Sequence, residues 1–202
     1  NVTFAYDKEP VLKNADFEMK RGEFIAISGL SGIGKSTFLK LILGIIHPDT
    51  GEAHVYAENE NKNVFAYVPQ GNLILSGTIR ENIAFYSPLD DEKIKEAAQI
   101  ADIYDFVETL PNGFDTVLGE KGLGLSEGQV QRIAIARAVY SGAEFLILDE
   151  CTSALDEETE AQVLKNLKNQ KNKSCIIVSH KKAALDICEK LIKIENKQIF
   201  VS

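Results

Sequence analysis

Residues 24–37 read FIAISGLSGIGKST, and this stretch decides the fold. Its first four residues form a continuous apolar run, which is typical of a strand buried on both faces of a sheet. Glycines follow at positions 29, 32 and 34, and Lys35 and Ser36 come directly after them. An amphipathic pattern continues to about residue 43, which indicates a helix. The stretch therefore predicts a strand, a glycine-rich turn and a helix in succession.

The spacing within this turn matches the phosphate-binding P-loop pattern, two glycines separated by four residues and then Lys-Ser. The glycines let successive backbone N–H groups turn inward around phosphates, and the following helix points its positive end at the same anion. Lys35 would place a cation against the β- and γ-phosphates, and the Ser36 hydroxyl could ligate Mg²⁺. We therefore expect nucleotide contacts along the loop and the first helical turn, at Gly29, Ser31, Gly32, Ile33, Gly34, Lys35, Ser36 and Thr37.

The apolar run at 145–148 ends in two carboxylates, Asp149 and Glu150. Apolar strands often end in acidic residues, so this pair gains its meaning from the P-loop. Beside bound phosphates, Asp149 would hold Mg²⁺ through its water shell, and Glu150 would polarise the attacking water. Cys151 follows directly, and we interpret it as a small packing residue rather than a thiol nucleophile.

Strand-like and helix-like segments alternate along the chain, which predicts an α/β fold with a mostly parallel sheet. Asp90 or Asp91 is the expected N-cap of one helix. Further strands are expected at 2–6, 64–68, 145–148 and 175–178, helices at about 78–108, 126–140, 156–168 and 181–188, and a β-hairpin in the last dozen residues.

This order predicts one domain over residues 1–202. We expect a P-loop NTPase core with a small antiparallel β subdomain in 1–70 and 142–202. A mainly helical subdomain is inserted at about 71–141.

Composition excludes several classes of protein. The 202 residues contain 22 Lys and Arg against 30 Asp and Glu, a net charge of −8. A duplex nucleic-acid binder would show a basic face, so we expect no nucleic-acid partner. The three cysteines show no metal-ligand spacing, which indicates free thiols. No apolar run reaches the roughly 18 residues of a spanning helix. Because the chain begins at Asn1 without methionine, we expect a fragment whose membrane domain lies outside it.

Residues 125–129 read LSEGQ, with Gln131 and Arg132 after them, and resemble the signature motif of the ATP-binding cassette (ABC) family, usually Leu-Ser-Gly-Gly-Gln. The resemblance covers essentially the whole chain, because the family's other motifs follow in order. It implies that Tyr6 stacks on adenine and that Gln70 senses Mg²⁺ and the attacking water. It also implies that Asp156 communicates across a dimer and that His180 contacts the γ-phosphate.

The signature segment has a physical reading of its own, since Ser126 and Gly128 stand at an expected helix N-terminus, which favours anions. The P-loop already holds the phosphates of the same chain. The resemblance implies that two such domains pack head to tail, so that each signature closes on the ATP of the other. The residues assigned to this contact are Ser126, Glu127, Gly128 and Gln129.

Residues 75–83 (LSGTIRENI) and 116–122 (TVLGEKG) resemble stretches that exporters of this family place against their membrane domain. The resemblance therefore implies an Mg-ATP-hydrolysing motor at the cytoplasmic face of the cell membrane, with a second ATPase domain and a transmembrane domain as partners. An importer subunit would lack both stretches. A chromosome-associated relative would carry a long coiled coil, a ribosome-associated one a second such domain, and a plain P-loop kinase would give the signature no role.

Three departures from the family pattern stand out. Glu127 replaces a glycine and puts a carboxylate near a site meant for an anion. Val130 stands where a polar residue is common. The connection between Gly51 and Tyr67 is short, so we expect a trimmed antiparallel subdomain.

The assignment of Tyr6 generates the first prediction. If its ring stacks on adenine, Tyr6→Ala weakens ATP binding by about 1–3 kcal/mol, and Tyr6→Trp is tolerated because only a flat face is required. Equilibrium titration with ATP measures both. If the wild type and Tyr6→Ala bind ATP with equal affinity, Tyr6 has only a packing role.

Overall fold

A six-stranded sheet forms the centre of the computed structural model, which describes residues 1–55, 64–71, 74–119, 124–170 and 173–202. All pairings within this sheet are parallel except the antiparallel hairpin of β9 and β10. The strand order is β10-β9-β3-β8-β7-β4, with β3 at Phe24–Ser28, β4 at Phe65–Val68, β7 at Phe145–Asp149, β8 at Ser174–Val178, β9 at Lys190–Glu195 and β10 at Gln198–Val201.

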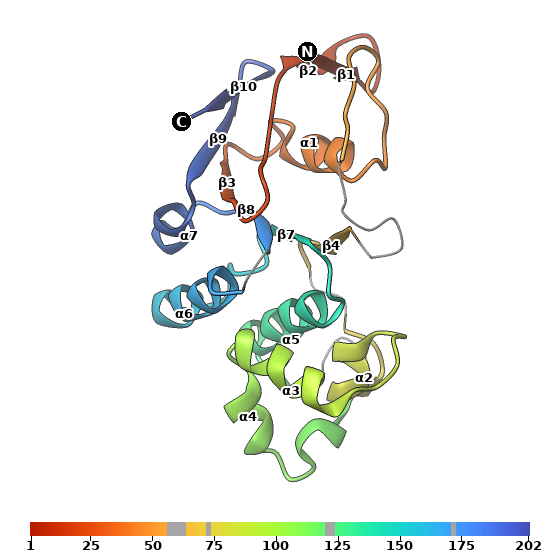
Figure 1. Cartoon of the computed structure of the whole chain (residues 1–202), viewed down its shortest axis with the longest axis vertical. Coiled ribbons are helices and arrows are strands. Elements are labelled where there is room, and N and C mark those ends of the chain that lie inside the picture. Colours follow the sequence, from red (N-terminus) through yellow and green to blue (C-terminus); the bar gives the residue numbers. More distant parts are fainter. Residues whose placement is uncertain (56–63, 72–73, 120–123, 171–172) are drawn as a thin grey trace.

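The two faces of the sheet carry separate hydrophobic cores, because side chains alternate along each strand. In β3, Ile25 and Ile27 pack with α1 (Lys35–Ile42) and with a small antiparallel sheet of β1 (Val2–Ala5) and β2 (Pro10–Ala15). Phe24 faces the other core, which contains α5 (Glu127–Tyr140), α6 (Glu157–Lys168) and α7 (Lys182–Ile187). Figure 1 shows α1 and the β1–β2 pair above the sheet, with α5 and α6 below it.

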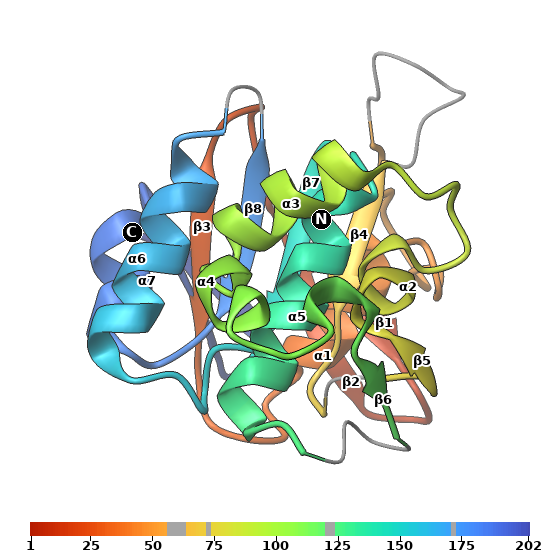
Figure 2. The ribbon, with the colours of Figure 1, turned by 90° about the horizontal axis from the view of Figure 1, so that it is seen from below.

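The helical segment lies beyond α5, at the bottom of Figure 1. It contains α2 (Ile79–Ala84), α3 (Asp91–Ile100), α4 (Tyr104–Glu108) and the 3₁₀ turn η1 (Gly113–Asp115), and α2 and α3 pack against α5. A two-residue ribbon of β5 (Gly77–Thr78) and β6 (Val117–Leu118) joins its start to its end. The view from below in Figure 2 shows α3, α5 and α6 over the strands.

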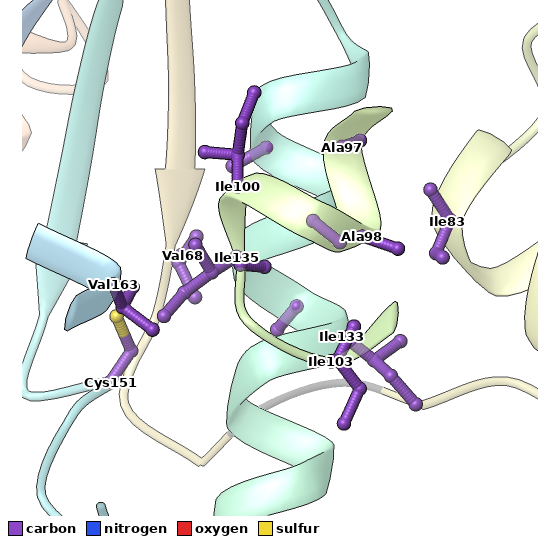
Figure 3. Close-up of a cluster of buried hydrophobic side chains, with 14 of the residues drawn as sticks. Val68, Ile83, Ala97, Ala98, Ile100, Ile103, Ile133, Ile135, Cys151 and Val163 are labelled. Carbon is purple, nitrogen blue, oxygen red and sulfur yellow. The ribbon is translucent and has the colours of Figure 1, made fainter. Parts of the chain in front are cut away.

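Helix α5 is buried between the helical segment and the sheet. Ile133 and Ile135 are fully buried on it. Figure 3 shows Ile133 near Ile103 of the helical segment, and Ile135 near Val68 of β4. One helix thus connects both parts of the chain through apolar contacts.

The predicted α/β class with a mostly parallel sheet is confirmed, as are the terminal hairpin and the Asp90 N-cap, whose carboxylate accepts from the Lys93 N–H. The helical pattern expected over 78–108 is divided into α2, α3 and α4, and β2 and the β5–β6 ribbon were not expected. Both ribbon strands are too short to show a periodicity of two. The short connection between Gly51 and Tyr67 falls partly on residues 56–63, outside the described residues.

The position of Ile135 generates the second prediction. Ile135→Ala lowers the free energy of unfolding by about 2–5 kcal/mol, and Ile135→Val by about 0.5–1.5 kcal/mol, because both leave a cavity where α5 meets the sheet. The control is Leu89→Ala, since Leu89 is exposed. Urea unfolding measures all three. A loss for Ile135→Ala no larger than that for Leu89→Ala would contradict this view of α5.

Candidate nucleotide-binding site

The chain segments that follow β3, β7 and β8 leave the sheet at one edge, because these strands are parallel neighbours. Ile27 is the register partner of Val178, and Val178 is also the partner of Asp149. The P-loop, Glu150 and His180 therefore meet at one edge, although more than a hundred residues separate the first from the others. Crevices at the carboxyl ends of parallel strands are where α/β proteins bind ligands.

The P-loop turns directly from β3 into α1. Gly34 stands just before the helix with φ of 115°, a conformation that only glycine adopts without strain. A Cβ atom at this position would lie 3.1 Å from Cγ1 of Val11. The other predicted loop residues follow the same turn, with Ser31, Gly32 and Ser36 exposed, Gly29 and Ile33 partly buried, and Thr37 buried.

Lys35 closes the loop from inside. Its Nζ donates to the carbonyl oxygens of Gly29 at 2.5 Å and Leu30 at 3.2 Å, and the side chain is buried. Its charge is therefore held within the glycine turn, where it can act on an anion bound by the backbone N–H groups.

Asp149 ends β7 and is held by a residue that the sequence analysis did not single out. The Tyr67 hydroxyl, on the neighbouring strand β4, donates to Asp149 Oδ2 at 3.0 Å. Burial raises the pKa of the Asp149 carboxyl above its ordinary value, although this hydrogen bond acts in the opposite direction. Burial and the neighbouring carboxylate also raise the pKa of the Tyr67 hydroxyl, so Tyr67 stays a donor.

Glu150 follows in a left-handed backbone conformation, with φ of 51°. Such a conformation is uncommon for residues other than glycine and costs on the order of 1–3 kcal/mol, so it persists only where neighbours enforce it. The Glu150 N–H donates to the Val178 carbonyl at 3.1 Å. Its carboxylate accepts from Nε2 of Gln70 at 2.7 Å. The structure thus joins Gln70 and Glu150 directly.

His180 and Tyr6 complete the set at this edge. Nδ1 of His180 lies 3.2 Å from Oγ of Ser28, the last residue of β3, within hydrogen-bonding distance. The Tyr6 ring packs edge-on against Phe4 and is 60% exposed. Its hydroxyl accepts from Thr37 Oγ1 at 3.5 Å, which places an open aromatic face beside the first turn of α1.

The signature residues form the start of α5. The Ser126 side chain caps the helix by accepting from the Gln129 N–H, and the Gln129 side chain accepts from the Ser126 N–H in return. Glu127 lies in the first turn and is exposed. A Cβ atom on Gly128 would lie 3.2 Å from the Ala154 carbonyl oxygen. The signature therefore packs against the loop before α6.

That loop, residues 152–155, is held from two sides. Nε2 of Gln131 donates to the Ser153 hydroxyl, and its Oε1 accepts from the Ala154 N–H, both at 3.0 Å. From the other side, the Lys181 ammonium donates to the backbone carbonyl oxygens of the first and last residues of the loop. Sequence reasoning missed Lys181, and nothing in the sequence marks it, because its partners lie 26 and 29 residues away.

Asp156 and Cys151 stand at the two ends of this loop. Asp156 caps α6, accepting from the Thr159 N–H and hydroxyl, and this bonding lowers the pKa of its carboxyl. Cys151 is fully buried beside Val163 (Figure 3), and burial raises the pKa of its thiol. The interpretation of Cys151 as a packing residue is confirmed.

A nucleoside triphosphate with Mg²⁺ fits these residues. Mg²⁺ prefers oxygen ligands, and the Ser36 hydroxyl and the Asp149 carboxylate supply them. Gln70 donates through Nε2, which leaves its amide oxygen as a ligand atom. The described residues contain no group of three His, Cys, Asp or Glu side chains that could hold a metal ion.

The sequence matches the family described as "ABC transporter" over residues 12–153, more than half of the chain. A probable ABC transporter ATP-binding/permease protein of Haemophilus influenzae is 42% identical over 97% of this chain and 37% of its own length. An ATP-dependent lipid A-core flippase of Desulfotalea psychrophila is 38% identical, over 98% of this chain and 36% of its own length. The chain thus spans little more than a third of these relatives.

A solved structure of a bacterial Atm1-family ABC exporter with ATP bound aligns with 99% of this chain and 37% of its own chain, with a TM-score of 0.88 and 32% identity. None of the helices in the described ranges combines the length and hydrophobicity needed to cross a bilayer. The expected exporter type is confirmed by these relatives, and the importer and non-transport alternatives are not favoured. The chain belongs to the ABC transporter family, as an ATP-binding domain of the exporter type.

Proposed function

We propose that this chain is the motor of an exporter, hydrolysing Mg-ATP between two head-to-tail copies of such a domain and thereby driving a transmembrane partner. The observation that carries the proposal is the 2.7 Å hydrogen bond between Gln70 and Glu150, beside the P-loop. A half-buried carboxylate at a phosphate-binding edge, oriented by an amide, is suited to accept a proton from water.

ATP would bind at the edge of the sheet where the P-loop lies. The backbone N–H groups between Gly29 and Thr37, with the buried Lys35, hold the β- and γ-phosphates. Tyr6 offers its exposed face to the adenine. Mg²⁺, when bound, supplies charge neutralisation to the phosphate oxygens, and Ser36, Gln70 and Asp149 are the residues that would hold it. The Tyr67 hydroxyl keeps the Asp149 carboxylate oriented toward this position.

Hydrolysis depends on a positioned water. Glu150 accepts a proton as the water oxygen bonds to the γ-phosphorus. The bond from that phosphorus to the β–γ bridging oxygen breaks, which releases ADP and inorganic phosphate. Charge that develops on the γ-phosphate oxygens is met by Lys35 and by His180, which Ser28 orients. Gln70 holds the Glu150 carboxylate in place.

The signature completes the site from the partner domain. Ser126 and Gln129 cap α5 by bonding to each other's backbone N–H groups, and the first turn of this helix carries its positive dipole end. A γ-phosphate presented there by a second chain would be attracted to this positive end. Asp156, the N-cap of α6, would contact the same partner.

The membrane partner would contact the helical segment. Phe85, Tyr86 and Leu89 follow the exporter-like stretch 75–83, Val117 lies within the other, and all four are exposed apolar side chains. The relatives are ATP-binding/permease proteins, which supports a transmembrane domain as the occupant and the cytoplasmic membrane face as the location. Arg80 pairs with Asp91 and Asp115 and is a structural crosslink here. Glu120 lies outside the described residues.

The role of Glu150 gives the third prediction. Glu150→Gln keeps the shape and the contact with Gln70 but removes the base, so turnover falls by roughly 10²–10⁴. ATP still binds, and an ATP-held dimer accumulates because product is not formed. Phosphate release and gel filtration with ATP measure the two effects. The matched control is Glu195→Gln, an exposed glutamate on β9. Turnover of Glu150→Gln equal to that of the control would remove Glu150 from the mechanism.

The exposure of Glu127 gives the fourth prediction. In the Glu150→Gln background, Glu127→Gly tightens the ATP-dependent dimer about two- to fivefold, the size expected for one exposed charge contact. The gain is largest at low ionic strength, where repulsion between the carboxylate and the triphosphate is least screened. Analytical ultracentrifugation at two salt concentrations measures it. An unchanged dissociation constant at both would mean that Glu127 faces away from the nucleotide.

A further inference from the structure

The ammonium group of Lys181 holds the loop of residues 152–155, which lies between Glu150 and Asp156. Nζ of Lys181 donates to the carbonyl oxygen of Thr152 at 2.9 Å and to that of Leu155 at 2.6 Å. These carbonyls stand at the two ends of the four-residue loop. A lysine ammonium has three N–H donors, so one donor remains for a further acceptor.

The same ammonium forms an ion pair with Glu160, which is completely buried on α6. Its Oε2 lies 3.5 Å from Lys181 Nζ, and its Oε1 accepts from the Thr152 hydroxyl at 2.7 Å. Oε2 has no hydrogen-bond donor among the described residues, so the Lys181 charge is what compensates it. A buried carboxylate that loses its cation is strongly disfavoured, which ties Lys181, the loop and α6 together.

Lys181 also ties the loop to the opposite side of the nucleotide site. It follows His180 directly, and its N–H donates to the Ser179 hydroxyl at 3.1 Å. His180 is therefore the sequence neighbour of the residue whose side chain holds the loop. Gln131, on the signature helix, holds the centre of the same loop. A displacement of the loop therefore acts on the contacts with both Gln131 and Lys181.

We propose that Lys181 is a positioning residue that transmits the placement of loop 152–155 to His180. This inference rests on the proposed function, in which a partner domain presses on the loop near Asp156. Pressure there moves the Thr152 and Leu155 carbonyls, and Lys181 passes the movement to His180. Hydrolysis then depends on docking of the partner, while capture of ATP by the P-loop does not.

The experiment compares Lys181→Met, which keeps the length of the side chain and removes its donors, with Lys181→Arg. Its matched control is Lys182→Met, since Lys182 is the exposed neighbour. Lys181→Met lowers kcat by roughly 10- to 100-fold, the effect of a catalytic group misplaced by about 1 Å. The KM for ATP is unchanged, because the lost interaction acts only on the transition state. Lys181→Arg retains most of kcat, and Lys182→Met matches the wild type.

A second readout is independent of hydrolysis. Amide hydrogen exchange of the peptide spanning residues 150–157 is faster in Lys181→Met than in Lys182→Met, because the loop is released. Glu160→Gln, which keeps the volume of Glu160 and removes the charge that faces Lys181, gives the same two effects more weakly. Glu160→Gln is the variant that tests the proposal if Lys181→Met fails to fold.

The results distinguish a failure of the proposed role of Lys181 from a failure of the proposed function. Unchanged exchange in a folded Lys181→Met overturns the grip on the loop, whatever happens to hydrolysis. Faster exchange with an unchanged kcat, or a kcat that Lys181→Arg does not restore, overturns the transmission to His180. Absence of ATP hydrolysis in the wild type, or its survival in Glu150→Gln, overturns the proposed function, while the exchange result still stands.

Discussion

Parallel pairing of β3 with β8 and of β8 with β7 is the constraint on which the site depends. It places the P-loop, the Asp149–Glu150 pair and His180 at one edge of the sheet, where no local sequence feature could bring them together. Glu150 has a left-handed backbone conformation, and its N–H donates to the carbonyl of Val178, the last residue of β8. A slip of register by one residue would turn Asp149 toward the opposite face.

Hydrogen bonds set the candidate catalytic groups in place. Gln70 orients Glu150, Tyr67 orients Asp149, and Ser28 lies against His180. Groups that are oriented beforehand need no reorganisation when charge develops on the phosphate. The same arrangement extends away from the nucleotide, since Gln131 and Lys181 grip one loop from the signature helix and from the His180 segment. In the proposed dimer, these hydrogen bonds would connect the two surfaces of the chain that face different ATP molecules.

The sequence predicted the fold class and placed the P-loop and the strand-end carboxylates correctly on their elements, because these features are local and have a characteristic periodicity or spacing. It missed β2, whose pairing with β1 is irregular, and the β5–β6 ribbon, whose strands are only two residues long. It could not find Tyr67 or Lys181. Tyr67 meets Asp149 across 82 residues through the β4–β7 register, and Lys181 meets backbone carbonyls, which have no residue type to recognise.

The central claim is that each hydrolytic site forms only when a second domain supplies its signature. Phosphate release from Mg-ATP, measured per chain over a wide range of chain concentrations, tests it most directly. The account predicts that the rate per chain rises with concentration and then reaches a plateau as dimers form, and that removing Mg²⁺ with EDTA abolishes it. A rate per chain that stays constant down to concentrations at which gel filtration shows only monomers would contradict the account.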